Sequence, residues 1–429
     1  MIGSRANIHQ QIYLFTTAAI AFTLPLFVNI NSYLIVILAV NWIAEGQLQQ
    51  KFRALKKNKW SWLYLGFFLI FLLGIIHSDN TSAALHHVEK KMALLVFPLI
   101  FFSTSFSEKI KKWTFTGFLA GCFTATIICL VSAVGIYIEE GATHQFFYHG
   151  LSRFIGINAI YLAMYLLFCV IILITFFGKK YKKLTSTGRV LYIALGFYFL
   201  ILIFLLSSKI VILLLFLFLN ILLISFFIIR KKIWRGVILF LLINSVFILI
   251  LKLTPLQERF GTELRSNMDV LHLEKYNYDT PFTGVTLRIT FWKFLIEILN
   301  EKKAWLTGVG TGDVKEILNE KYIERNIYTG NPELGDTGYL GYNLHNQYFQ
   351  LLLGLGIFGM IYFIGILVIP AVKAAQRKYW LYLFFLILFA LMCLTESLLE
   401  THKGVVFFAL FNSLFIKDLF SNNKNAENL

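Results

Sequence analysis

His345, Asn346 and Tyr348 are the residues best placed to do chemistry, because they stand where a long polar segment meets an apolar run. An imidazole changes charge near neutral pH, so at a membrane–water boundary it can act as a general base toward a substrate from either phase. The alternative interpretation is a histidine at a helix start, bonded to a neighbouring carbonyl group. The position at the end of the one large loop, residues 254–344, favours the catalytic interpretation.

Three cationic residues could bind a phosphate group. Arg288 opens an amphipathic segment, 288–300, and its guanidinium fork suits a phosphate at a membrane surface, although a contact with solvent or lipid headgroups is equally compatible. Lys209 lies between two long apolar runs, where a charge is costly unless it faces a polar cavity. Arg153 precedes another apolar run and could join the same site or extend toward lipid headgroups.

Two carboxylates, Glu396 and Glu400, lie in a short polar turn near the end of the chain. They could orient an acceptor or pair with the arginines, and a simple surface turn explains them equally well. No cluster has the spacing of metal ligands: His86, His87 and Glu89 fit no usual geometry, and the four cysteines lie in apolar runs. We expect neither a metal site nor a cofactor.

The glycine-rich segment 308–312 (GVGTG) does not fit a nucleotide site, because the Lys-Ser/Thr pair of a phosphate-binding loop does not follow it. We expect it to form a tight turn before a helix. Whether its amide groups also contact a sugar or a phosphate stays open at this stage.

The elements that must position these residues are membrane helices. The chain is 58% hydrophobic and 14% charged, and apolar runs recur along its length without the alternation of barrel strands. The first run lacks a small-residue cleavage site, so we expect no cleavable signal peptide. We predict an all-α polytopic membrane protein with about twelve transmembrane helices, near 12–30, 32–46, 60–77, 88–106, 114–137, 154–177, 190–206, 208–229, 236–253, 345–369, 380–396 and 404–420.

The basic residues set the orientation. The segments that we assign to the cytoplasm hold 23 Lys/Arg and 4 Asp/Glu, whereas the other side holds 16 and 19. The net charge of +16 is therefore a positive-inside signal and requires no nucleic acid. Both termini are expected in the cytoplasm. The chain then divides into helices 1–9 (1–253), a periplasmic loop (254–344), and helices 10–12 with a cytoplasmic tail (345–429).

The large loop is expected to be partly helical. Leu287, Phe291, Phe294, Leu295 and Ile298 form a helical stripe, and a second helix is predicted near 313–325. The segment 328–342 is rich in Gly, Asn and Pro and is expected to be irregular. A loop of this length in a compact protein is usually functional.

Taken in order, these motifs resemble the O-antigen ligase and polymerase superfamily of bacterial membrane glycosyltransferases. The resemblance covers roughly residues 150–410 and rests on Ser207-Ser208-Lys209, Arg288 with Trp292, the glycine-rich turn, His345-Asn346 and the late acidic turn. The family's Ser-Arg element carries Lys209 here, which places one phosphate contact in doubt because lysine lacks a bidentate fork.

The resemblance implies a fold of the C-type glycosyltransferase kind and metal-independent catalysis at the periplasmic face of the bacterial inner membrane. The donor would be a glycan on undecaprenyl pyrophosphate, and a ligase would pass it to lipid A–core in lipopolysaccharide biosynthesis. A polysaccharide polymerase of the O-antigen or capsule type and a protein O-oligosaccharyltransferase are the near alternatives. A polysaccharide or lipid transporter or flippase is the alternative of another class, although the polar residues concentrate on one face.

In this interpretation His345 is the base or the group that orients the acceptor, Arg288 and Lys209 bind the pyrophosphate, and Arg153 supports them. Asn346, Tyr348, Glu396 and Glu400 would contact the acceptor or the donor. The sugar, the acceptor and the oligomeric state cannot be deduced from the sequence.

Overall fold

The computed structural model describes residues 2–107, 109–253, 261, 268–331, 333 and 335–421. Within these ranges all regular elements are helices and no strand is present, which confirms the all-α expectation. Residues 254–260 and 262–267 of the predicted loop and residues 422–429 of the predicted cytoplasmic tail lie outside the described residues.

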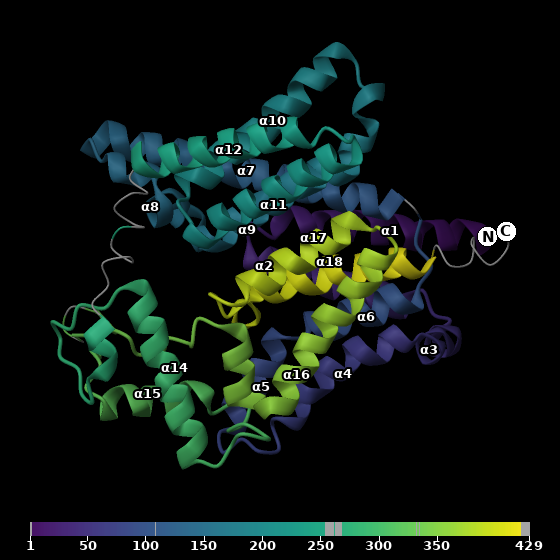
Figure 1. Cartoon of the computed structure of the whole chain (residues 1–429). Helices are drawn as coiled ribbons and strands as arrows, with labels where there is room; N and C mark the ends of the chain where they lie inside the picture. The colour runs from purple at the N-terminus through teal and green to yellow at the C-terminus, as the bar shows by residue number, and fades with distance from the viewer. Residues whose placement is uncertain are drawn as a thin grey trace.

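The apolar helices form one bundle, which occupies the upper and right-hand parts of Figure 1. Its larger helices are α1 (Ile2–Thr23), α2 (Val28–Ala44), α4 (Lys59–Leu73), α6 (Ala93–Ser103), α7 (Lys109–Glu140), α9 (Ala159–Ile172), α10 (Ser186–Leu205), α11 (Lys209–Ile229), α12 (Ile233–Leu253), α16 (Gln347–Gln376), α17 (Trp380–Met392) and α18 (His402–Ser421). Shorter helices connect them, among them α3 (Leu48–Lys57), α5 (Thr81–Lys90) and α8 (Tyr148–Ser152).

Helix α9 is the centre of this bundle. Every residue from Tyr161 to Ile172 is buried, as expected for a helix that is apolar on all sides. Phe168 packs against Phe385 of α17 and Phe407 and Phe411 of α18, with ring centroids 4.9–5.3 Å apart. By contrast, α10 to α12 expose many large apolar side chains, as helices that face hydrocarbon chains do.

Among the described residues, five helices are long and apolar enough to cross a membrane, namely α7, α9 with its extension to Phe177, α10, α11 and α16. A sixth is added if α2 and α3, which meet at an angle of 106°, count as one span. These helices make the chain a multi-pass membrane protein, and the number of twelve spans stays a prediction. The predicted span 88–106 is divided into α5 and α6, and the expected break at Ser207-Ser208 separates α10 from α11.

The loop segment folds into a small outer domain with its own core. Its described elements are η5 (Met268–His272), α14 (Gly284–Glu301) and α15 (Val314–Glu324), and they lie to one side of the bundle (Figure 1). Phe291, Phe294, Leu295 and Ile298 of the predicted stripe are buried, together with Tyr322 of α15. Both predicted loop helices are thus present, but α14 begins at Gly284, so that Arg288 lies in its second turn.

Helix α16 joins the outer domain to the bundle through a kink. Gly356 has φ 67° and ψ −171°, and a β-carbon there would come within 2.1 Å of the Leu306 carbonyl oxygen. The Ile357 amide instead donates to the Trp305 carbonyl oxygen over 2.9 Å. The first turns of α16 contribute Leu352 and Leu353 to the outer core, whereas Phe363 and Ile366 beyond the kink pack into the bundle.

Candidate active site between the bundle and the outer domain

A cavity of about 440 Å³ lies where the outer domain meets the bundle. Five separate segments form its wall: the starts of α8, α9, α11 and α14, and the turn before α18. Its lining residues are Tyr148, Ile160, Ser208, Lys209, Ile210, Leu213, Gly284, Val285, Arg288, Thr395 and Glu396. Two predicted phosphate ligands and one predicted carboxylate therefore share one hollow.

Arg288 is positioned by the first turns of α14. Thr283 caps this helix, since its side chain accepts from the Thr286 amide while Thr286 bonds back to the Thr283 amide. The guanidinium donates from Nη1 to the Gly284 carbonyl oxygen, 3.1 Å away, and from Nη2 to Glu396 Oε1, 3.3 Å away. Its Nε is buried without a hydrogen-bond partner, so the hydrogen-bonding capacity of the guanidinium is not fully used within the protein.

Lys209 owes its place to the break between α10 and α11. Ser207 adopts φ 48°, a left-handed conformation that non-glycine residues rarely adopt, and this ends α10. Ser208 then starts α11 as its N-cap residue and is 1% exposed, with an Oγ atom that has no hydrogen-bond partner. Strained backbone and an unsatisfied hydroxyl next to a cation are typical of a binding site.

His345 is not a lining residue of this cavity, but it lies next to the lining residue Glu396. Its Nδ1 is 3.7 Å from Glu396 Oε2, and its backbone has φ 46°. The strained conformation is held by local bonds: the His345 amide donates to Asn343 Oδ1 over 2.8 Å, and Trp292 Nε1 donates to the Leu344 carbonyl oxygen over 2.9 Å. Glu396 thus stands between the guanidinium and the imidazole and can orient both.

Asn346 and Tyr348 make structural contacts. Asn346 caps α16 by accepting from the Phe349 amide, and its Nδ2 donates to the Leu394 carbonyl oxygen. The Tyr348 hydroxyl donates to the Ala390 carbonyl oxygen over 2.9 Å. Both side chains therefore attach the start of α16, and His345 with it, to the end of α17 and the segment after it.

Glu400 faces another set of partners. Its Oε1 is 3.4 Å from Lys91 Nζ, and its Oε2 is 3.6 Å from His87 Nδ1. Lys91 Nζ also lies 3.1 Å from His87 Nδ1, so that the neutral imidazole can accept a hydrogen bond from the ammonium group. Burial lowers the pKa of His87 to about 4, against the opposing effect of Glu400, and Lys91 and His87 lower the pKa of Glu400 although burial raises it.

Arg153 is exposed and does not line the cavity. Two lining residues with polar side chains were not singled out in the sequence: Tyr148, which has φ 50°, and Thr395. Ser208 was noted only as part of a motif, and its adjacency to Lys209 was the available signal. Nothing in the local sequence distinguishes Tyr148 from other interfacial tyrosines.

The backbone amides of the glycine-rich turn, residues 309–312, are hydrogen-bonded within the protein. The amides of Val309 and Gly310 donate to carbonyl oxygens of Leu353 and Gly354, and those of Thr311 and Gly312 donate to Gly74 O and Ser78 Oγ. A β-carbon at Gly308 would meet the Gly354 backbone at 2.4 Å. The turn fastens the outer domain to α16 and to the segment after α4, and these amides are not available to a phosphate.

Among the described residues, no group of three or more His, Cys, Asp and Glu side chains could hold a metal ion. The charged groups of the cavity are Arg288, Lys209 and Glu396. Such a set can bind an anion, and a neighbouring imidazole can accept a proton.

Residues 194–364 match a protein-family model described as O-Antigen ligase. The matched range includes the Ser207-Ser208-Lys209 break, Arg288 and His345. No curated protein matches the chain.

Proposed function

We propose, since the chain belongs to the O-antigen ligase superfamily, that it transfers a glycan from undecaprenyl pyrophosphate to lipid A–core at the periplasmic face of the bacterial inner membrane. The observation that carries this proposal is the cavity that Arg288, Lys209 and Glu396 share. His345 lies next to it, with Nδ1 3.7 Å from Glu396 Oε2.

The cationic side of the cavity suits the leaving group. When the sugar departs, negative charge grows on the lipid pyrophosphate, and cations already fixed in a partly desolvated site stabilise it without reorganisation. Arg288 would bind through its guanidinium fork, and Lys209 would add a point charge. The exposed Arg153 would contact parts of the donor that extend beyond the cavity.

His345 supplies the proton acceptor. The acceptor hydroxyl transfers its proton to the imidazole while its oxygen bonds to the anomeric carbon, and the bond from that carbon to the pyrophosphate breaks. Glu396 next to Nδ1 would orient the ring and stabilise the imidazolium that forms, so Nε2 would face the acceptor. The apolar part of the cavity wall, Ile160, Ile210 and Leu213, would lie against the start of the lipid chain.

This chemistry needs no metal ion, so we expect transfer to persist in excess chelator. It is the same for a polysaccharide polymerase and for a protein O-oligosaccharyltransferase, which differ from a ligase in the acceptor. A deletion strain separates them: loss of all polymer from the lipid core indicates a ligase, and retention of one repeat unit indicates a polymerase.

The direct test is glycan transfer in membranes from a lipid-linked donor. We expect His345→Ala to reduce the transfer rate about 10²–10⁴-fold, the range for loss of a general base. His272→Ala is the matched control, because His272 is exposed in the same outer domain. Unchanged turnover by correctly folded His345→Ala would exclude the base assignment. Movement of the lipid-linked glycan across the membrane without transfer would favour a flippase.

A further inference from the structure

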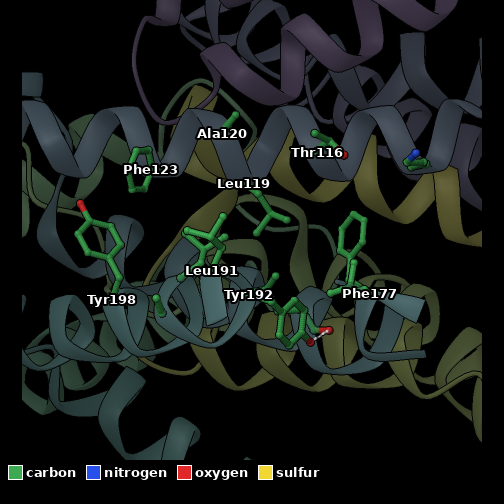
Figure 2. Close-up of a pocket in the computed structure, with 13 residues that line it drawn as sticks. Thr116, Leu119, Ala120, Phe123, Phe177, Leu191, Tyr192 and Tyr198 are labelled. Atoms are coloured by element: carbon green, nitrogen blue, oxygen red, sulfur yellow. Dashed lines mark hydrogen bonds between the residues drawn. The ribbon is translucent and has the colours of Figure 1, made fainter. Parts of the chain in front are cut away.

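A long apolar groove lies away from the candidate active site, between α7 and α10 (Figure 2). Its volume is about 920 Å³, and its wall is almost entirely apolar. Figure 2 shows Leu119 and Phe123 of α7 pointing toward Leu191, Tyr192 and Tyr198 of α10, with Phe177 near one end. Thr116 and Ala120 of α7 also line the groove.

The two tyrosines do not make this groove polar. Tyr192 donates its hydroxyl to the Leu173 carbonyl oxygen over 2.6 Å, and the Tyr198 hydroxyl lies 3.0 Å from Thr126 Oγ1. Next to the groove, Phe197 and Ile201 of α10 and Ile127 of α7 are exposed apolar side chains. The groove therefore adjoins a surface of the kind that faces hydrocarbon chains.

One end of the groove is strongly basic. Lys112 is the one charged residue in the lining, and it is exposed, whereas its neighbour Lys111 is neutralised by Asp418 at 2.5 Å. The segment 178–183 runs from the lining residue Phe177 to the lining residue Leu184. It exposes Lys179, Lys182 and Lys183, and Arg189 follows on the first turn of α10.

Carboxylates that could neutralise this cluster are lacking in the neighbouring sequence. No Asp or Glu occurs between Glu140 and Glu258. Asp418, the carboxylate on the adjacent α18, is engaged by Lys111. Within the described residues no ion pair involves Lys112, Lys182 or Lys183.

We propose that this groove is a binding site for an anionic phospholipid, with one acyl chain between α7 and α10 and the phosphate at the Lys112 end. The basic end of the groove, which we call its mouth, favours an anionic headgroup, and the apolar wall favours an acyl chain. Such a lipid would fill a packing defect beside a helix, α10, that has few buried side chains of its own. The site is independent of the proposed glycan transfer.

The basic residues at the end of the groove belong to segments that we assign to the cytoplasm. We therefore expect the lipid to come from the cytoplasmic leaflet, which is anionic at its surface. The far end of a polyprenyl donor chain could also enter an apolar groove, but it would gain nothing from the cations. A second copy of this chain could cover the same face, and it would change the size of the particle.

The test measures lipid retention and thermal stability of the purified full chain. Native mass spectrometry counts bound dioleoylphosphatidylglycerol and dioleoylphosphatidylcholine, and thermal midpoints are taken with each lipid. The first variant removes three charges at the mouth, Lys112→Gln with Lys182→Gln and Lys183→Gln. Its matched control removes three charges from the α11–α12 connection, Arg230→Gln with Lys231→Gln and Lys232→Gln. A second variant, Ala120→Trp, fills the groove without changing charge.

We expect the phosphatidylglycerol lipid to bind to the wild type and the control and to raise their thermal midpoints. The mouth variant should retain about tenfold less of it, and Ala120→Trp should lose it although all charges remain. Equal losses in the two triple variants, or equal retention of both lipids, would overturn the proposal. So would retention of the lipid by Ala120→Trp, or a dimeric particle whose interface covers the groove.

Discussion

Glu396 and Glu400 lie four residues apart in the same turn, yet they belong to two different regions. Glu396 contacts Arg288 and His345, whose side chains are 26% and 27% exposed and retain buried nitrogens without hydrogen bonds. Glu400 contacts Lys91 and His87, and Lys91 is 1% exposed, closely enclosed and packed over the Phe71 ring. The first cluster borders a cavity, whereas the second is closed.

The difference indicates that the Glu396 cluster can bind a ligand, whereas the Glu400 cluster has a structural role. A charged group that lines a cavity can bind a ligand, whereas an enclosed ion pair has no room for one. The Lys91–Glu400 pair attaches α5 and the start of α6 to the turn that carries Glu396. We therefore assign Glu400, which the sequence grouped with the substrate contacts, a role in holding that turn.

Exchanging the two carboxylates for amides should give opposite outcomes, and this is the largest expected effect. Glu400→Gln leaves the buried Lys91 ammonium without its counter-charge and should lower the free energy of unfolding by about 3 kcal/mol. Glu396→Gln keeps a hydrogen-bond acceptor for Arg288 but removes the charge beside His345, so transfer should fall by about 10–100-fold with little change in stability. Thermal denaturation and transfer rates measured on the same preparations check both.

If Glu400→Gln lost activity at a temperature where it is fully folded, the assignment of Glu400 to support would be wrong.

The closed cluster should also make stability depend on pH. The pKa of His87 is about 4 in the folded protein, below its ordinary value of 6.5, so the unfolded chain binds more protons between these values. The free energy of unfolding is therefore highest above pH 6.5 and decreases as the pH falls toward 4. We expect a decrease of about 2 kcal/mol, checked by thermal midpoints across this range.

His87→Gln should flatten this pH dependence, while His272→Ala should leave it unchanged. The lowered pKa of Glu400 acts in the same direction below its ordinary value of 4.5. A stability that rises on acidification would contradict a neutral, buried His87.

The smallest expected effect concerns Ser208, whose buried hydroxyl has no partner in the structure. Ser208→Ala removes one potential hydrogen bond to a ligand and should raise the donor KM by less than about tenfold. Stability should stay within about 0.5 kcal/mol, because no intramolecular hydrogen bond of this hydroxyl is lost. A fall in stability without a change in KM would show that Ser208 serves only the helix start.

Local sequence patterns predicted the helices well, because hydrophobic period and length are local properties. The stripe from Leu287 to Ile298 is present in α14, and the break at Ser207-Ser208 separates two helices. The kink at Gly356 was not predicted, since it depends on the backbone of residues 305–307, some fifty positions earlier in the chain.

The site was predictable in its residue types but not in its pairing. Arg288 and Glu396 are separated by 108 positions, and Lys91 and Glu400 by more than 300, so only the packing of the helices brings them together. A motif can indicate that a carboxylate matters, but it cannot assign that carboxylate to a cavity or to a closed ion pair.

The central claim is that Arg288 and Lys209 bind a lipid pyrophosphate at the cavity beside Glu396. Binding of farnesyl pyrophosphate to the purified protein tests it most directly, with Lys112→Gln as the control for a cation at the other groove. We predict that Arg288→Ala combined with Lys209→Gln raises the dissociation constant at least about tenfold. An unchanged thermal midpoint would show that the variant is correctly folded. An affinity equal to that of the wild type would contradict the account.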